Sequence, residues 1–441
     1  MPEREAHVDI PLVDDLGRIG EDLVDEMAID DELLAVTRRD RRQPAALDEG
    51  AKGGGLERRV VEGPEAGRRG GMVGAHGPAS YDGEVPPDDP RIGAHLPLGA
   101  GMVKAAERAV AIGAGCIQVF ADNPTAWARR RTPPRQLDAF RDVLAAGGVR
   151  PIAIHAAYLI NLAGNDRVFG RQSRAVLEAE LRAAPGFGAT LVNVHIGSHK
   201  GTSVAAGIHR VARSVARVLD AVPDGPEAPM LVLENSAGSG WGIGTTVREL
   251  ARIAEQADRL GVPAHRLGFC LDAAHAWGAG HRMDDPTAID RLLDEFEARI
   301  GLRRLVLVHL NDSRSERGSR HDRHEHVGAG RIGEAGLGHL VRHPRLRHAA
   351  FVVETPGMDE GYDAVNVARA RDLLAGRPLE TLPPEAFRIK SSRSKGVAPP
   401  ETEVEAEAQA LTRGDELTAA SAGATRAGAA GADPSSRPTA A

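Results

Sequence analysis

Imidazole and carboxylate side chains stand at the ends of short apolar segments throughout the middle of this chain. PIAIH, LVNVH and MLVLEN, for example, each end in or near such a side chain. Carboxylates close together repel, and burying them unpaired costs several kcal/mol each, so a divalent cation is needed to hold them in one place. Imidazole and carboxylate without thiolate suit Zn²⁺ or Mn²⁺, with iron as a further alternative. The residues at these ends are His95, His155, His195, Glu234, Asp272, His309 and Glu354.

Two further segments add side chains of the same kind. In DAAH, His275 follows Asp272 by three residues, a spacing at which one turn can present both. In DRH, Asp322 and His324 have one residue between them, so in an extended chain they point the same way. Arg323 then points elsewhere, toward a phosphate or an acid.

Any one of these histidines alone would be weak evidence for a metal. A lone histidine is more often a hydrogen-bonded core or surface residue, and we interpret His209, His343 and His348 as surface residues. The evidence for a metal centre is the repetition, because chance placement of a ligand-type side chain at the end of one apolar segment after another is improbable.

The apolar segments are predicted strands, and they alternate with longer segments of helical period. The predicted strands cover residues 91–96, 116–121, 151–155, 191–195, 230–235, 267–272, 304–310 and 350–355. The predicted helices cover residues 101–113, 135–147, 171–187, 203–221, 245–260, 286–300, 334–343 and 360–375. This α/β pattern fits a (β/α)8 TIM barrel, in which the carboxyl ends of all strands meet on one face. A doubly wound open sheet is the alternative, but AHLPLGAG is a poor match to its glycine-rich phosphate loop.

The barrel is predicted to occupy residues 91–377, between two extensions of different composition. The chain has 441 residues and a formal net charge of −7. The excess of acidic residues lies in the flanks, while the middle is mildly basic and so compatible with a polyanionic partner. Residues 1–90 are predicted to be an acidic, largely disordered extension with one amphipathic helix over 16–37, and residues 378–441 a low-complexity disordered tail.

Cysteine content and hydropathy exclude several further classes of protein. The two cysteines, Cys116 and Cys270, exclude a disulfide scaffold and a zinc site built from four thiolates. No apolar run approaches the roughly 18 residues that a membrane helix needs. The first residues lack the basic and apolar regions of a signal peptide. We therefore expect a cytoplasmic protein with no membrane partner.

The middle of the chain resembles the endonuclease IV (deoxyribonuclease IV) family of apurinic/apyrimidinic endonucleases, which are TIM barrels. The resemblance covers residues 91 to about 375. It is carried by IGAHLPLGAG, HAAYLINLAG, NVHIGSH, LENSAGSGWGIG, CLDAAHAWGAG, VHLNDSRSERGSRHDRHEHVGAGRIG and VVETP. The long HLNDS…DRH…IG string makes this a specific match.

The resemblance implies a centre of three zinc ions, with Mn²⁺ as an alternative metal at one or more sites. One zinc would take His155, His195 and Glu234, the second would share Glu234 and add Asp272, His309 and Glu354, and the third would take His275, Asp322 and His324. His95 matches a family position close to the metals, where we expect it to support ligands without binding a metal itself.

The activity implied by the resemblance is phosphodiester hydrolysis on the 5′ side of an abasic site in duplex DNA, as in base excision repair. The product would carry a 3′-hydroxyl. Zinc lowers the pKa of a bound water to roughly 7, so hydroxide is available at neutral pH. Glu234, as the bridging ligand, and Glu354, as a group that orients the nucleophile, are the expected catalytic residues. A monomer is expected.

The resemblance also implies DNA contacts. Tyr158 and Leu159 match residues that the family inserts into the base stack, and unstacking costs least where a base is already missing. The family loop after the second strand carries an arginine that enters DNA, but residues 123–127 read NPTAW here and lack it. Arg129 and Arg130 follow closely and are predicted to substitute. Arg323 is predicted to contact DNA as well.

Two alternatives stay open from the sequence. A metal-dependent sugar isomerase or epimerase on a related barrel also places Glu, Asp and His at strand ends, but has no need of the group formed by His275, Asp322 and His324. A DNA-binding relative with weakened catalysis is the other alternative, because the loop at 123–127 departs from the family pattern.

Overall fold

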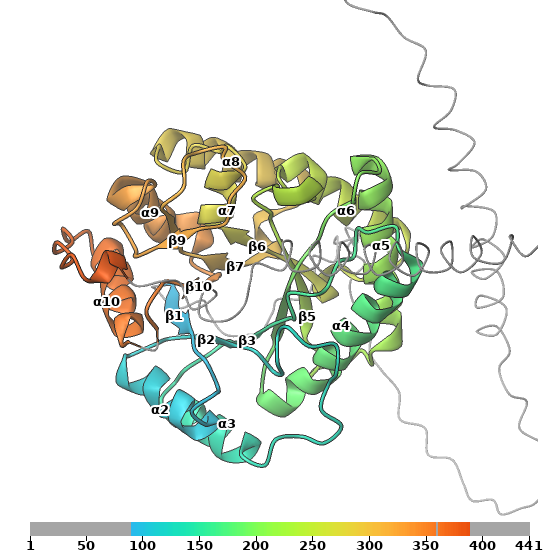
Figure 1. The fold of residues 1–441 in the computed structure, drawn as a ribbon, viewed down its shortest axis with the longest axis horizontal. Coiled ribbons are helices and arrows are strands. Elements are labelled where there is room, and N and C mark those ends of the chain that lie inside the picture. The colour runs from blue at the N-terminus through green and yellow to red at the C-terminus, as the bar shows by residue number, and fades with distance from the viewer. Residues whose placement is uncertain (1–89, 359, 389–441) are drawn as a thin grey trace, which may run out of the picture. The chain divides into compact units, whose positions relative to one another are not determined.

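The computed structural model describes residues 90–358 and 360–388. Within them, eight parallel strands close into a barrel in the order β1-β10-β7-β6-β5-β4-β3-β2 (Figure 1). The strands are β1 (Arg91–His95), β2 (Ile117–Val119), β3 (Ile152–His155), β4 (Leu191–His195), β5 (Met230–Glu234), β6 (Leu267–Asp272), β7 (Leu305–His309) and β10 (Ala350–Val353). The predicted TIM barrel is therefore confirmed.

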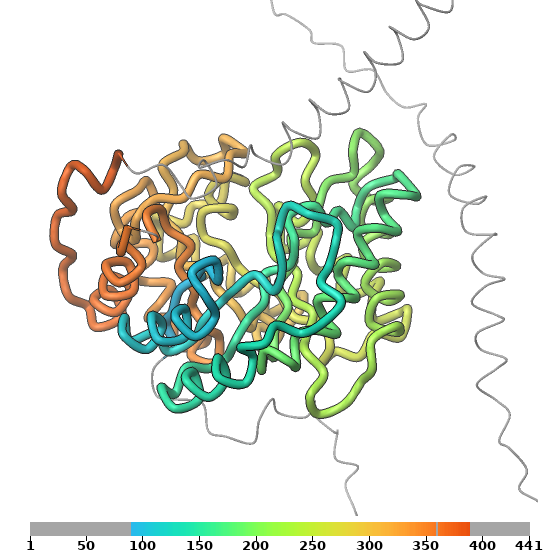
Figure 2. The backbone as a smooth tube through the Cα atoms, turned by 60° about the horizontal axis from the view of Figure 1, so that its bottom comes forward, coloured from blue at the N-terminus to red at the C-terminus, as the bar shows by residue number. Residues whose placement is uncertain are grey.

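Helices between successive strands cover the outside of the barrel, and Figure 2 shows the chain passing around it in sequence order. They are α2 (Met102–Ala111), α3 (Leu137–Ala146), α4 (Arg167–Phe187), α5 (Val204–Ala221), α6 (Val247–Arg259), α8 (Pro286–Arg299), α9 (Gly333–Arg342) and α10 (Tyr362–Leu374). Most of them bury an apolar face against the barrel. In α5, for example, Ile208, Val211 and Val215 share one buried face, at spacings of three and four residues.

Three local features differ from the sequence prediction. The helix predicted from residue 171 begins at Arg167, because the Asp166 carboxylate caps it by accepting hydrogen bonds from the backbone N–H groups of Val168 and Phe169, both at 2.8 Å. The second strand is shorter than predicted, 117–119. The turn predicted after the sixth strand is a short helix, α7 (Ala273–Gly278).

A two-stranded antiparallel hairpin that the sequence did not predict follows β7. It pairs β8 (Asp312–Ser313) with β9 (His324–Glu325). The buried Asp312 carboxylate fixes its base by accepting hydrogen bonds from the backbone N–H groups of Gly330, Ile332 and Gly333, at 2.9–3.1 Å. The hairpin thereby brings the DRH segment back over the carboxyl ends of the strands.

The ordered packing extends past the predicted boundary at residue 377. Ala386, in a short 3₁₀ turn, is fully buried, and its carbonyl oxygen lies 3.1 Å from Nε2 of His326. The predicted helix over 16–37 and the rest of the predicted extensions, residues 1–89 and 389–441, lie outside the described residues. Among the described helices, none is long and apolar enough to cross a membrane.

Candidate metal centre

The structure brings together all nine side chains that the sequence predicts as metal ligands. Most stand at the carboxyl ends of β3, β4, β5, β6 and β7 or just after β10, and the remainder come from α7 and the segment entering β9. The donor atoms of eight of them form three groups, within each of which the atoms lie within 4.8 Å of one another, and Asp322 joins through its contacts with His275 and His324. The groups are His155, His195 and Glu234; Asp272, His309 and Glu354; and Asp272, His275 and His324.

Glu234 lies at the middle of the centre and is almost fully buried. Its Oε2 is 3.5 Å from Nε2 of His155, and its Oε1 is 3.5 Å from Nε2 of His195. The same Oε1 is 3.5 Å from Nδ1 of His309, which in turn lies 3.3 Å from Oε2 of Glu354. One carboxylate thus faces the donors of two groups, as a bridging ligand must.

The third group forms where the hairpin meets α7. Nε2 of His275 is 3.3 Å from Oδ2 of Asp322, and Nε2 of His324 is 2.9 Å from Oδ1 of the same carboxylate. His324 also lies 3.6 Å from Oδ2 of Asp272. Asp322 and His324 therefore point the same way, as their spacing predicts, and Arg323 between them is exposed.

The unpaired donors of the centre fit divalent cations. Four buried atoms that converge here have no hydrogen-bond partner among the described residues: Nε2 of His155, Nε2 of His195, Oε1 of Glu234 and Nδ1 of His309. Buried polar atoms are normally satisfied, and leaving one unsatisfied costs about 1–3 kcal/mol. Metal ions coordinated by these atoms would remove that cost.

Backbone carbonyls lie close to one ring nitrogen in each of three histidines, and in His275 the same nitrogen also lies 3.0 Å from Oε1 of Glu234. Nδ1 of His155 lies 2.7 Å from the carbonyl oxygen of Ala156, and Nδ1 of His324 lies 2.8 Å from that of Glu354. Nδ1 of His275 lies 3.0 Å from the carbonyl oxygen of Asn235. A carbonyl can only accept, so each Nδ1 carries the proton and each Nε2 is left as a metal donor.

Amide side chains that sequence reasoning missed hold the ligands in place. Gln118, fully buried in β2, donates from Nε2 to Glu354 at 2.7 Å and accepts at Oε1 from His309 at 3.1 Å. Asn193 donates to Glu234 at 2.6 Å, and Asn311 donates to Asp272 at 2.7 Å. A polar amide inside a predicted barrel strand, as in IQV or LVNVH, was the signal available for the first two.

His95 lies beside the donor groups and stays predicted as a residue that supports them. Its Nδ1 lies 3.0 Å from Nε2 of Gln118 and 3.4 Å from Oε1 of Glu354. Burial lowers its pKa, so the ring is neutral at pH 7. It contacts the ligand Glu354 without joining any of the three donor groups.

The carboxylates of the centre stay ionised in spite of burial. Burial alone would raise the pKa of Glu234, but the imidazoles of His195 and His309 hold it well below its usual value. Burial likewise opposes the ionised form of Glu354, and His309 again carries its pKa well below the usual value. The thiol of Cys270 lies within 4.8 Å of donor atoms of Glu234 and His309, and burial raises its pKa to about 12.

The predicted wedge residues lie beside the metal ligands. Tyr158 is half-buried, with its ring centroid 5.5 Å from that of His155 and 5.2 Å from that of Phe120. Its backbone N–H donates to the carbonyl oxygen of Pro124 at 3.0 Å, which joins the loop after β3 to the loop after β2. Leu159 is half-buried next to it.

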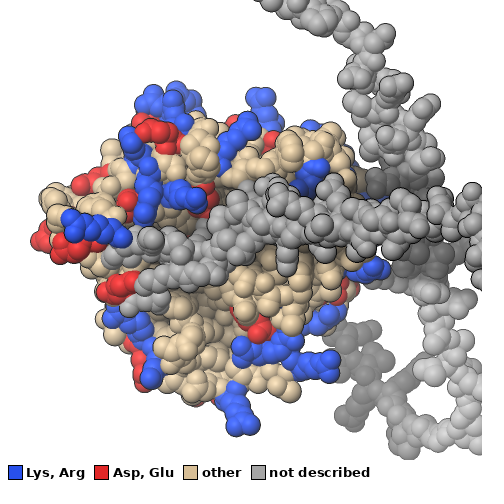
Figure 3. All heavy atoms as spheres, in the orientation of Figure 1, with Lys and Arg blue, Asp and Glu red and all other residues tan. Residues whose placement is uncertain are grey.

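The predicted DNA-contacting arginines differ in exposure. The Arg129 side chain is only 10% exposed, because its Nε lies 3.2 Å from the buried carboxylate of Glu180 on α4. Arg129 therefore joins the loop after β2 to α4 instead of facing solvent. Arg130 is exposed and forms an ion pair with Asp122 at 2.9 Å. On the face shown in Figure 3, Lys and Arg side chains stand in separate groups among Asp and Glu.

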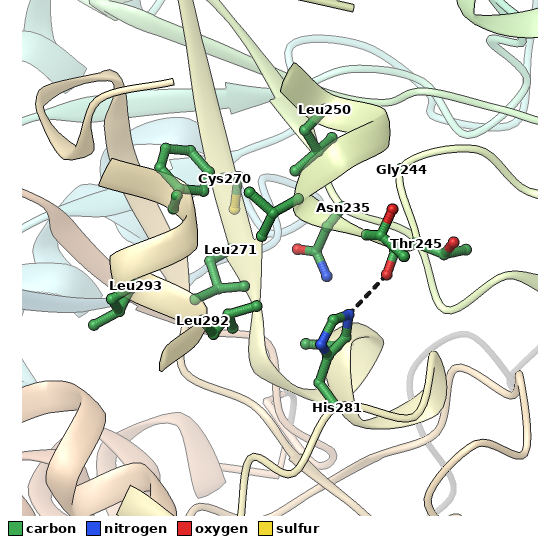
Figure 4. Close-up of a pocket in the computed structure, with 13 residues that line it drawn as sticks. Asn235, Gly244, Thr245, Leu250, Cys270, Leu271, His281, Leu292 and Leu293 are labelled. Atoms are coloured by element: carbon green, nitrogen blue, oxygen red, sulfur yellow. Dashed lines mark hydrogen bonds between the residues drawn. The ribbon is translucent and has the colours of Figure 1, made fainter. Parts of the chain in front are cut away.

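A small cavity lies behind the centre and is not the substrate site. It is about 20 Å³ and lies between the ends of β5 and β6 and helices α6 and α8 (Figure 4). Leu250, Leu271 and Leu293 line it, and His281 closes one side with Nε2 at 2.8 Å from the carbonyl oxygen of Thr245. It has room for about one water molecule, not for a nucleotide.

Comparison with known proteins shows which family this barrel is similar to. A family model described as a xylose isomerase-like TIM barrel matches residues 106–377. The probable endonuclease 4 of Methanoculleus marisnigri is 36% identical over 282 residues, which cover 64% of this chain and 98% of that protein. For the probable endonuclease 4 of Halorhodospira halophila, the identity is 40% over 277 residues, 62% of this chain and 90% of that protein. The crystal structure of endonuclease IV from Thermus thermophilus matches with 35% identity and a TM-score of 0.57, covering 65% of this chain and all of that one. With this similarity along nearly the full length of these proteins, the chain belongs to the endonuclease IV family.

Proposed function

We propose that this protein is a zinc-dependent apurinic/apyrimidinic endonuclease that cleaves duplex DNA on the 5′ side of an abasic site and leaves a 3′-hydroxyl, as a step of base excision repair. The observation that carries the proposal is the convergence of nine imidazole and carboxylate side chains, Glu234 among them, of which four present buried donor atoms without a hydrogen-bond partner among the described residues. The relatives named endonuclease 4 supply the reaction class.

The ligand set divides among three sites as the family pattern implies. His155, His195 and Glu234 would hold one ion, Glu234 with Asp272, His309 and Glu354 a second, and His275, Asp322 and His324 a third. Zinc bound there would supply Lewis acidity at the scissile phosphodiester. Mn²⁺ is the alternative metal, because it accepts the same oxygen and nitrogen donors.

The chain's own residues prepare the site for a phosphodiester. Gln118 donates a hydrogen bond to Oε1 of Glu354, and Asn311 donates one to Oδ2 of Asp272, so a buried amide holds each of these two carboxylates. His195, Asp322 and Glu354 are half-buried, so the centre is open to solvent at these residues. Glu354 is accordingly placed to orient an attacking water.

Selectivity for abasic DNA is proposed to rest on the loop after β3. Tyr158 and Leu159 are half-buried beside His155, close enough to the centre to enter a gap left by a missing base. Arg130 and Arg323, which are exposed, are proposed to contact the phosphate backbone, while Arg129 holds the loop after β2 in position against Glu180.

The direct test is incubation of the zinc-loaded protein with a duplex that carries one tetrahydrofuran abasic analogue. Incision on its 5′ side with a 3′-hydroxyl product is expected, and an undamaged duplex should stay intact. Tight binding without incision would favour the DNA-binding relative with weakened catalysis. Because the matching family model also describes xylose isomerase-like barrels, aldose and ketose conversion should be assayed alongside, and sugar isomerisation without incision would overturn the proposal.

A further inference from the structure

Three ligand-type side chains meet on the outside of the barrel, away from the centre described above. His339 lies on α9, His343 caps its carboxyl end, and Asp290 lies on the neighbouring helix α8. Figures 1 and 2 show these two helices side by side on the outer layer. The sequence alone suggests that His343 is a plain surface residue, but its side chain is only 7% exposed and turned toward Asp290.

The donor atoms of these three residues converge on one point. Nε2 of His339 lies 2.7 Å from Oδ1 of Asp290, and Nε2 of His343 lies 3.3 Å from the same oxygen. All three donors lie within 4.8 Å of one another. His339 in the last turn of α9 and His343 directly after it supply two imidazoles, and Asp290 from α8 completes a set of two imidazoles and one carboxylate.

The surroundings favour a cation at this point. The last carbonyl groups of α9 give its carboxyl end a partial negative charge, which attracts cations. Arg345, whose charge acts on His343, forms an ion pair with Asp294, with Nη2 2.9 Å from that carboxylate. Burial and Arg345 lower the pKa of His343, so the ring is neutral, which is the form that binds metals.

We propose that Asp290, His339 and His343 form an additional metal site that takes Zn²⁺ or a similar late first-row cation and links α8 to α9. Asp290 is 46% exposed and His339 30% exposed, so solvent reaches the site and water can complete the coordination. Its role is structural, because it joins two outer helices and includes none of the residues of the centre around Glu234.

Binding has one cost that the structure shows. Nδ1 of His343 accepts a hydrogen bond from the backbone N–H of Arg345 at 3.3 Å, at the start of the 3₁₀ turn Pro344–Leu346. When Nε2 binds the cation, Nδ1 carries the ring proton and this long hydrogen bond is lost. Metal binding should therefore alter the backbone amide signal of Arg345, which gives a local readout.

The test uses the full chain without an affinity tag, with the centre around Glu234 already loaded with zinc. Additional ZnCl₂ is titrated by calorimetry, and bound zinc is counted after removal of free metal. Wild type is compared with His339→Ala and with the milder Asp290→Asn. His265→Ala is the matched control, because His265 is an exposed histidine 3.6 Å from Asp224 that lacks a second imidazole.

Wild type and His265→Ala should each bind one zinc more per chain than His339→Ala. Added zinc should raise the Tm of those two proteins and leave that of His339→Ala unchanged. All variants should still incise abasic DNA, so this result is separate from the proposed nuclease function. Equal zinc binding by wild type, His339→Ala and Asp290→Asn would overturn the proposal.

Discussion

Replacing Gln118 with leucine isolates the contribution of one buried amide to the metal centre. Gln118 is fully buried in β2, and its amide meets two ligands at once: Nε2 donates to Glu354 at 2.7 Å, and Oε1 accepts from His309 at 3.1 Å. The second contact keeps the proton of His309 on Nε2, so that Nδ1 faces Glu234 and Glu354. Leucine has a similar volume but offers neither hydrogen bond.

The expected magnitude follows from these two contacts. Loss of an outer partner of a metal ligand typically weakens metal affinity or activity 10–100-fold, about 1.4–2.7 kcal/mol. Gln118 contacts one ligand histidine and one ligand carboxylate, so we expect the upper half of this range. The apolar replacement also leaves the buried Nε2 of His309 without a partner at a cost of about 1–3 kcal/mol.

Two assays measure the effect separately. Zinc release to a competing chelator reports metal affinity, and kcat/KM on the abasic duplex reports activity. Gln256→Leu is the matched control, because Gln256 is a partly buried amide on α6 outside the three ligand groups. If Gln118→Leu retained zinc as wild type does and kept its kcat/KM, the amide would have no role in holding the ligands. Circular dichroism of the zinc-free proteins checks that each variant folds.

Three further predictions concern the centre and the loops beside it. Glu234→Gln should lose almost all incision while keeping its circular dichroism spectrum, because a neutral amide cannot bridge two cations; turnover like that of wild type would contradict the bridging role. Tyr158→Ala should weaken binding to the abasic duplex more than to undamaged duplex in a fluorescence titration, and equal losses would argue against a wedge. Burial raises the pKa of Glu180 from 4.5 to about 8, in spite of the Arg129 charge. The folded state therefore retains a proton that the unfolded chain releases near pH 4.5. The free energy of unfolding of wild type, relative to that of Glu180→Gln, should fall by up to about 1.4 kcal/mol per pH unit between about pH 4.5 and 8. Urea unfolding of both proteins across this range checks it, and parallel pH profiles would show that Glu180 is ionised throughout.

The sequence by itself determined the barrel and indicated which side chains we propose as ligands. Strands and helices follow from the spacing of apolar residues along the chain, and β5 and α5 are examples of each. Parallel strands in a closed barrel bring their carboxyl ends to one face, so a side chain such as Glu234 at a strand end can be assigned to the site without coordinates. Chain order and residue type carry this information.

Only the tertiary structure decided which groups meet across the barrel. The amide of Gln118 reaches His309, 191 residues later, and Arg129 turns inward to Glu180 on another element. Asp290 meets His339 and His343 because α8 and α9 pack as neighbours. These contacts depend on side-chain direction and on the packing of elements far apart in sequence, and local period and composition specify neither.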